Sequence, residues 1–363
     1  MRRSIVLSSL LGLLTIASVS TLAGCAAEPA PTIGSGSKRT PTKPPAETND
    51  DIPASDLGPA PAPTPAPSTG TEIGSETWKD GKQLTGSVTI KPGATVDIDP
   101  GASVTVATDA AITVKGTLSV KAGATHAKLG GKNWKGIVVA SGGSLVVDGL
   151  DITDAENGVW TMAGNTDAKL TNGIITNAQA PFKMEPGSTL TVLKTNVVKA
   201  TGASLIAGTF SGSFMNYDKG SAGGLELNDA AGSMTISDSV LRGVGGGDYV
   251  VSRAGKLVKV EYTTISGSHC GLHFDAVDRY VIDHVSDDQN SYGAMLYGSG
   301  AGPNQIISSN VRSTEKDLAM SGTNGVLTID KSYTGGKNTL QANAQITNAA
   351  TAPIADAKPR APN

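Results

Sequence analysis

Apolar residues recur along one part of the chain at a nearly constant spacing. One series has gaps of 22 or 23 residues and consists of Val159, Phe182, Leu205, Leu227, Val250, Leu272, Met295 and Leu318. A single repeat of this length cannot bury its own apolar face, so the period indicates a solenoid whose coils cover one another.

Two further series accompany the first. The second consists of Leu145, Leu170, Leu190, Met234, Leu257, Val281 and Leu327, and the third of Ile152, Ile175, Val197, Val240, Ile265, Val285 and Val311. Apolar and polar residues alternate around these positions, which indicates short strands. Three strands per coil and about 23 residues per coil predict an all-β, three-faced parallel β-helix. Small residues after the third strand, such as Ala155 and Ala178, are expected at a tight corner.

Residues 80–340 resemble the right-handed parallel β-helix superfamily, which includes pectate lyases. The resemblance is carried by Trp134–Val139, Gly143–Val147 and Ile152–Ala155, whose strand and turn sequences are typical of bacterial members. It implies a right-handed solenoid, and we place this domain at residues 73–345.

The first 24 residues have the pattern of a secretory signal peptide. Arg2 and Arg3 precede a short apolar stretch that ends in small residues. Residues Leu22–Cys25 resemble the lipobox of bacterial lipoproteins, which implies cleavage before Cys25, diacylation of its thiol and anchoring to a membrane. Ala26 stands where Asp would favour inner-membrane retention, so the resemblance implies the outer membrane or cell surface.

Residues 25–72 form a predicted disordered linker that is rich in Pro, Ala and Thr. Such a composition favours extended polyproline conformations, so the segment serves either as a stalk or as a plain tether. We expect residues 346–363 to be a disordered tail, whose first part covers the last coil.

Composition limits the partners of this chain. The formal net charge is −3, and no basic patch favours nucleic acid. Aromatic residues make up only 4% of the chain, which suits a thin core column. Cys270, the one cysteine besides Cys25, is predicted to be a buried small hydrophobic residue on the inward face.

A polar stripe is predicted on the outer face of the first series. The residues beside the inward positions are Lys183, Glu185, Glu226, Arg253, His273 and Asp275. Arg253 precedes Asp275 by 22 residues, so the two should be lateral neighbours about 4.8 Å apart.

The segment around His273 is the richest chemical constellation in the sequence. The resemblance to β-helix lyases and hydrolases makes Arg253, His273, Asp275 and Asp278 the candidate catalytic residues, with Ca²⁺ as a cofactor only in the lyase case. No catalytic motif of these enzymes is matched residue by residue. The alternative is a solvated ion-pair surface. A metal site of His269, His273 and Asp275 is a further alternative, although His269 and His273 need not share a face.

Three apolar residues, Trp160, Ile206 and Leu296, are predicted to point outward, where they would stack on sugar rings, dock a partner or lie under a loop.

Asp287–Asn290 has the composition of a solvated loop.

Three functions remain open from the sequence. The preferred one is a lipid-anchored, non-enzymatic envelope protein whose rigid β-helix binds a glycan or an envelope protein. The ligand-binding candidates are then Trp160 and the polar stripe. The second is a polysaccharide lyase or hydrolase acting on acidic glycans, and the third is a structural envelope component.

Overall fold

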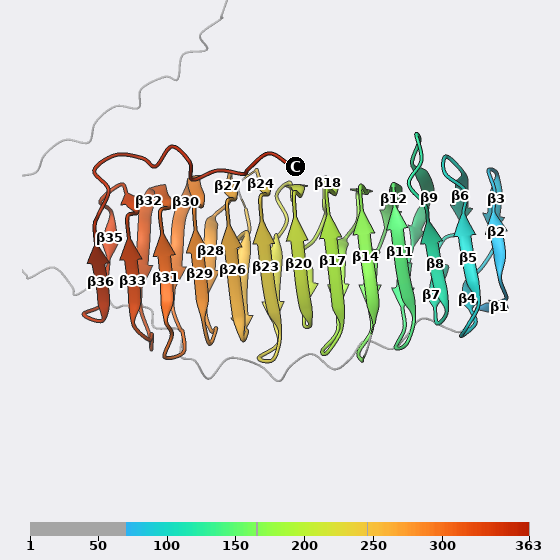
Figure 1. The fold of residues 1–363 in the computed structure, drawn as a ribbon, viewed down its shortest axis with the longest axis horizontal. Coiled ribbons are helices and arrows are strands. Elements are labelled where there is room, and N and C mark those ends of the chain that lie inside the picture. Colours follow the sequence, from blue (N-terminus) through green and yellow to red (C-terminus); the bar gives the residue numbers. More distant parts are fainter. Residues whose placement is uncertain (1–69, 165, 245, 363) are drawn as a thin grey trace, which may run out of the picture. The chain divides into compact units, whose positions relative to one another are not determined.

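The computed structural model describes residues 70–164, 166–244 and 246–362, which form a β-solenoid of about 11 turns without a helix. All of the strand pairs are parallel, and successive coils stack from β1 to β36 (Figure 1). The predicted all-β parallel β-helix is therefore confirmed. The signal peptide, Cys25 and the linker up to residue 69 lie outside the described residues.

The first column of strands contains the apolar series identified first. Its members are β1 (Thr71–Ile73), β4 (Val88–Ile90), β7 (Ala111–Val114), β10 (Gly136–Val139), β13 (Asn157–Thr161), β16 (Ala180–Met184), β19 (Ser204–Ile206), β22 (Leu225–Asn228), β25 (Val250–Ala254), β28 (Cys270–Phe274), the second halves of β30 (Ser286–Leu296) and β32 (Asn310–Met320), and β35 (Asn338–Thr339).

The second column is a separate 13-stranded sheet. It consists of β2 (Glu76–Trp78), β5 (Thr95–Ile98), β8 (Thr117–Val120), β11 (Ser144–Asp148), β14 (Asp167–Thr171), β17 (Thr189–Leu193), β20 (Thr209–Ser213), β23 (Ser233–Ser237), β26 (Leu257–Glu261), β29 (Tyr280–Asp283), β31 (Asn304–Ile307), β33 (Leu327–Asp330) and β36 (Ala344–Thr347).

The third column joins the first into one 23-stranded sheet, because β30 and β32 run through both. Its other members are β3 (Lys82–Leu84), β6 (Ser103–Val106), β9 (Ala127–Trp134), β12 (Leu150–Ala155), β15 (Ile174–Thr176), β18 (Asn196–Val198), β21 (Asn216–Asp218), β24 (Val240–Arg242), β27 (Thr264–Ser266) and β34 (Tyr333–Thr334).

The corner between the second and third columns repeats from coil to coil. A residue in the left-handed region stands there, for example Asp238 with φ of 49° and Tyr262 with φ of 46°. The buried hydroxyl of the next residue accepts a backbone N–H from the preceding coil: Met215 donates to Ser239 over 3.1 Å, and Ser239 donates to Thr263 over 3.4 Å. These hydroxyls satisfy amides that the sharp turn would otherwise leave unpaired.

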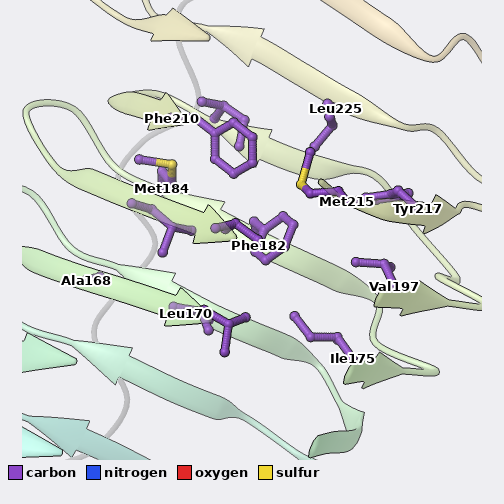
Figure 2. Close-up of a cluster of buried hydrophobic side chains, with 14 of the residues drawn as sticks. Ala168, Leu170, Ile175, Phe182, Met184, Val197, Phe210, Met215, Tyr217 and Leu225 are labelled. Carbon is purple, nitrogen blue, oxygen red and sulfur yellow. The ribbon is translucent and has the colours of Figure 1, made fainter. Parts of the chain in front are cut away.

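The core is the axis on which all three columns converge. Phe182 of the first column lies 5.5 Å from Phe210 of the second and 6.3 Å from Tyr217 of the third, measured between ring centroids. Figure 2 shows these rings among Leu and Val side chains of neighbouring coils. Each coil adds one thin layer of side chains to the core along the axis, so few large aromatic residues are needed.

The predicted inward phase is wrong in several coils. Leu205 and Met295 were expected to point inward and Ile206 and Leu296 outward, yet Leu205 is 37% exposed and Ile206 and Leu296 belong to the core. Met295 lies on the outer face beside His273. The same shift of one residue occurs in the other two columns. The inward residues are Val258, Ile282 and Leu241, where Leu257, Val281 and Val240 were predicted. Two adjacent apolar residues stand at each position, and a slip of one residue reverses the face of a strand.

Asp287–Asn290 is not a solvated loop. The segment belongs to β30, and the Asp287 side chain is 0% exposed, in register with Ile265 and Val311 of the third column. One carboxyl oxygen accepts a hydrogen bond from the Asn290 amide, and the other has no partner among the described residues. Burial raises the pKa of Asp287 well above its usual range.

The sequence predicts a disordered tail at residues 346–363, but residues 346 and 347 complete β36, and residues 348–362 run back along one edge of the solenoid (Figure 1). Arg360 donates two hydrogen bonds to Asp238, over 2.6 and 2.7 Å, and its guanidinium lies 3.9 Å from the centre of the Tyr262 ring. Asn310 accepts from the Ile354 N–H over 2.6 Å and donates to its carbonyl over 2.9 Å. The tail is thus held by side chains of the repeated corner.

Replacement of Asp287 by Val should stabilise the protein at neutral pH. An apolar side chain of similar volume removes a buried carboxyl with an unpaired oxygen, so we expect a gain of about 1–3 kcal/mol in the free energy of unfolding. The pKa of Asp287 is higher in the folded state than in the unfolded state, where it is near 3.9. The contribution of Asp287 to the free energy of unfolding is therefore most favourable below pH 3.9 and is lost as the pH rises. The gain should therefore shrink from pH 7 to pH 4 in denaturant titrations.

The matched control is Ile265→Val in the adjacent coil, which should cost about 0.5–1.5 kcal/mol with little dependence on pH. A loss of stability in Asp287→Val at pH 7 would show that the hydrogen bond to Asn290 outweighs the burial of the carboxyl.

Candidate functional site

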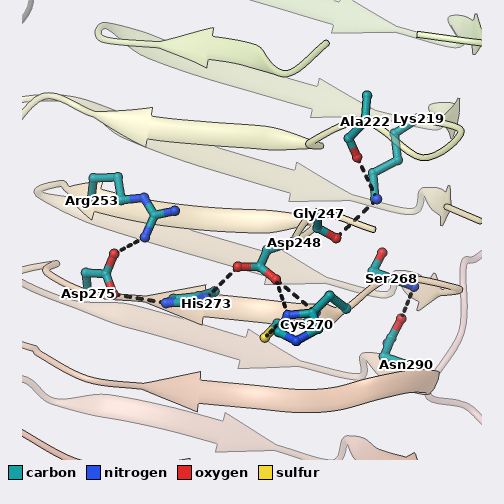
Figure 3. Close-up of polar contacts among 11 residues, drawn as sticks. Lys219, Ala222, Gly247, Asp248, Arg253, Ser268, Cys270, His273, Asp275 and Asn290 are labelled. Atoms are coloured by element: carbon teal, nitrogen blue, oxygen red, sulfur yellow. Dashed lines mark hydrogen bonds and ion pairs between the residues drawn. The ribbon is translucent and has the colours of Figure 1, made fainter. Parts of the chain in front are cut away.

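Four charged residues on the outer face of the first column form one chain of contacts. The register pairs Val251 in β25 with His273 in β28, so Arg253 lies beside Asp275. Arg253 donates to Asp275, as the spacing of 22 residues predicted, and its Nε lies 3.9 Å from Glu226 of the preceding coil. Asp275 in turn contacts Nε2 of His273 over 2.9 Å (Figure 3).

Asp248 completes this chain from the other side, and sequence reasoning missed it. Its Oδ2 lies 2.6 Å from Nδ1 of His273, and its Oδ1 lies 3.0 Å from Nδ1 of His269. The same Oδ1 accepts the backbone N–H of Cys270 over 3.0 Å. Asp248 precedes Cys270 by 22 residues, so the coil spacing that placed Arg253 beside Asp275 was an available signal.

His273 is enclosed between two carboxylates, and its side chain is 16% exposed. Burial alone would lower its pKa, but the hydrogen bonds to Asp248 and Asp275 outweigh burial and raise it to about 11. For the two carboxyls, burial favours the neutral form, yet the contacts with His273 lower the pKa of Asp248 and Asp275 below the usual range. The cluster therefore carries separated charges that neutralise one another.

Cys270 is buried as predicted, but not in the core. Its side chain packs with Met295 and Ala319 in a separate cluster on the outer face, and its Sγ lies 3.4 Å from Nδ1 of His269. Tyr249 and Val250 are consecutive core residues, so the alternation of the strand is broken at this corner. Burial raises the pKa of the Cys270 thiol.

Two polar anchors hold the segments that carry this site. The ammonium group of buried Lys219 donates to the carbonyls of Ala222 over 2.7 Å and Gly247 over 3.2 Å, directly before Asp248. On the other side, Asn290 accepts the Ser268 N–H over 2.8 Å, directly before His269 (Figure 3). Both loops are thus fixed by side chains from neighbouring coils.

The other candidates from the sequence lie apart from this cluster. Asp278 is exposed beyond the end of β28, where its N–H donates to the Gly255 carbonyl over 2.7 Å. The predicted metal set was His269, His273 and Asp275. Asp275 contacts Nε2 of His273, whereas Asp248 contacts Nδ1, so Asp275 lies on the other side of the ring from Asp248. The donor atoms that converge, all within 4.8 Å of one another, belong to Asp248, Cys270 and His273.

Of the alternatives for the outward-pointing Trp160, an exposed platform and a covered side chain, the structure shows a covered one, although two polar side chains contact it. Trp160 does point outward, but the Lys183 ammonium lies 3.9 Å from the centre of its ring, and its indole N–H donates to Glu185 over 3.1 Å. The polar stripe is also interrupted, because exposed Leu205 stands between Lys183 and Glu226.

A shallow cleft of about 520 Å³ lies on the outer face of the first column, near its N-terminal end. It contains polar groups from Thr113, Lys115 and Glu185 and apolar groups from Val138 and Met162. The hydroxyl of Thr89 is also buried at this cleft, without a hydrogen-bond partner in the described part of the chain.

Comparisons of the sequence with protein-family models and with curated proteins find no match. Among residues 70–164, 166–244 and 246–362, no helix has the length and apolar character needed to cross a membrane.

His273 should stay protonated across the neutral range in protein kept free of metal with EDTA. Its pKa is raised to about 11, so imidazole nitrogen shifts measured by NMR should report an imidazolium from pH 5 to 9. In the double variant Asp248→Asn/Asp275→Asn, the pKa of His273 should fall, because the two carboxylates no longer offset the effect of burial on the imidazolium. At a fixed pH, the ring signals of His126, which contacts Asp151 elsewhere, should be the same in the wild type and the double variant. Titration of wild-type His273 near pH 6.5 would contradict the arrangement.

Proposed function

We propose that this protein is an exported lipoprotein whose rigid β-helix binds an extended glycan without altering it chemically. The observation that carries the proposal is the straight outer face of the first column, where side chains stack at one residue per coil. That stack runs from Thr113 through Val138, Trp160, Lys183, Leu205, Glu226 and Val251 to His273, and its accessible members are the ones other than Val138, Trp160 and Val251. A straight row with a repeat near 4.8 Å suits a linear polymer better than a compact ligand.

The cleft on this face supports a glycan as the occupant. Sugars present apolar ring faces and a periphery of hydroxyl groups, and the cleft offers both the apolar groups of Pro92 and Met162 and the polar groups of Thr113 and Lys115. The cationic side chain of Lys115 favours an acidic polymer. An envelope protein that lies along the same face is the other kind of partner we expect.

The lipobox-like residues Leu22–Cys25 support the location we propose. A diacylated Cys25 would hold the protein at the outer membrane or cell surface, with the Pro-rich segment between the anchor and the β-helix. A single acyl chain gives only weak membrane attachment, so the two chains of a lipoprotein are needed for a stable anchor.

A polysaccharide lyase or hydrolase is the second candidate, because Arg253, His273 and Asp275 lie in direct contact. In this arrangement, however, Arg253 is engaged by Asp275, and His273 is enclosed by two carboxylates. The cluster does not suit Ca²⁺ either. Calcium takes six to eight oxygen ligands, whereas Arg253 and His273 bring a cation and ring nitrogens to the same place.

Binding should be tested with the full-length protein in detergent on an array of neutral and acidic polysaccharides. Lys115→Glu and Met162→Glu should each weaken binding at least about tenfold, because one repels an acidic polymer and the other places a charge against an apolar ring face. The control is Lys169→Glu, an exposed residue on the outer face of the second column, which should leave binding unchanged.

The bound polymers should then be examined for new reducing or unsaturated ends. Binding without products supports the proposal, whereas products that disappear in Asp275→Ala would establish the enzyme. Absence of binding to every polymer would overturn the glycan and direct attention to a protein partner.

The anchor requires a separate test. Cys25→Ala should move the protein from the membrane fraction to the soluble fraction of bacterial cells, because it removes the acylated thiol. Cys270→Ala removes the other cysteine and should leave the protein in the membrane fraction. A Cys25→Ala protein that stays with the membrane would exclude lipid anchoring through this residue.

A further inference from the structure

Four potential metal ligands meet on the outer face of the first column. They are a carboxylate from Asp248, imidazoles from His269 and His273, and the thiol of Cys270. One donor atom each from Asp248, Cys270 and His273 lies within 4.8 Å of the others. His269 adds a fourth donor, since its Nδ1 is 3.0 Å from Asp248 Oδ1 and 3.4 Å from Cys270 Sγ.

Two of these separations, both involving His269, are close to those of a tetrahedral site. Zinc bonds of about 2.0–2.3 Å to N, O and S ligands put neighbouring donor atoms roughly 3.3–3.7 Å apart. The observed contacts of Asp248 and Cys270 with His269 are within a few tenths of an ångström of that range. A cation at the centre would draw together the donor atoms of Asp248, Cys270 and His273, which already lie within 4.8 Å of one another.

The backbone that carries the donors is held from beneath. Gly271 separates Cys270 from His273, and a Cβ at Gly271 would lie 1.9 Å from Oδ1 of Asp287. A side chain at this position of β28 would therefore displace the buried Asp287 carboxyl, and Cys270, the residue before it, faces the cluster although alternation with Leu272 would direct it into the core. The anchors Asn290 and Lys219 fix the flanking loops, so the donors are positioned before any cation arrives.

The surroundings of the cluster resemble the outer shell of a metal site. Histidine ligands usually donate their second ring nitrogen to a carboxylate, which fixes the ring and strengthens the ligand. Here Nε2 of His273 lies 2.9 Å from Asp275, and Asp275 accepts from Arg253. Tyr292 and Met295 form an apolar wall beside Cys270, while His269 is 55% exposed and leaves a path for entry.

We propose that Asp248, His269, Cys270 and His273 bind a zinc ion in a closed tetrahedral site. The ion would link the coil that contains β25 to the next coil, which contains β28. A set of one thiolate, two imidazoles and one carboxylate favours zinc over calcium or magnesium. Binding releases the thiol proton of Cys270 and the Nδ1 proton of His273, while the Nε2–H of His273 continues to donate to Asp275. The row of side chains described above ends at His273, but the zinc site can be tested separately from glycan binding, because the cleft near Lys115 lies in other coils.

The test uses the full-length chain in detergent with Cys25 replaced by Ser, so that Cys270 is the sole cysteine. After removal of metal, the protein is titrated with Zn²⁺ and, separately, with Co²⁺. We expect one ion per chain, a higher melting temperature, and the thiolate-to-cobalt charge-transfer band of a tetrahedral site. Cys270→Ser should abolish that band and weaken binding at least about a hundredfold, and Asp275→Asn should weaken it about tenfold with the band retained.

His126→Gln is the matched control, since His126 pairs with Asp151 over 2.7 Å on another coil, and it should bind as the parent does. Circular dichroism establishes that each variant is folded. Absence of metal binding by the folded parent, one bound Co²⁺ without a thiolate band, or undiminished binding in Cys270→Ser would each overturn the site.

Discussion

The parallel ladder of backbone hydrogen bonds between consecutive coils is the constraint on which the rest of this structure depends. It fixes the distance between coils and the residue that each side chain faces one coil later. A single coil presents one apolar layer to the axis and is stable only when neighbours cover it. The corners, with their left-handed residues and buried hydroxyls, keep that register from one coil to the next.

Because the register is so regular, the all-β parallel solenoid could be predicted from the spacing of apolar residues and their alternation with polar ones. The columns, the parallel pairing and the contact between Arg253 and Asp275 follow from a repeat of 22 or 23 residues. Spacing cannot decide which of two adjacent apolar residues points inward, which explains the reversal at Leu205 and Ile206. Composition also cannot predict that the C-terminal tail is ordered, because Arg360 binds Asp238, which lies 122 residues away in sequence.

The candidate site was predictable only in part, for a related reason. Arg253 and Asp275 lie within regular strands, where alternation reveals the outward face. Asp248 and Cys270 stand at a corner, where two consecutive residues, Tyr249 and Val250, both enter the core and the alternation is lost. Asp287 and Asn290 were misassigned because polar residues inside a long strand have the composition of a loop.

The solenoid itself does not require this polar cluster. At the position of His273, other coils carry Val138, Leu205 or Ala319, so the stack tolerates apolar side chains there. Several polar groups that are costly to bury are nevertheless gathered around two coils. Lys219 lies beneath the loop before Asp248, and Asn290 and Asp287 lie beneath the segment that carries His269 and Cys270. A carboxylate also lies on each side of His273. Buried polar groups are tolerated when they are satisfied, but they contribute less to stability than packed apolar groups. Their concentration beneath a corner that also presents a thiol and two imidazoles is most simply explained by selection for the geometry of that corner.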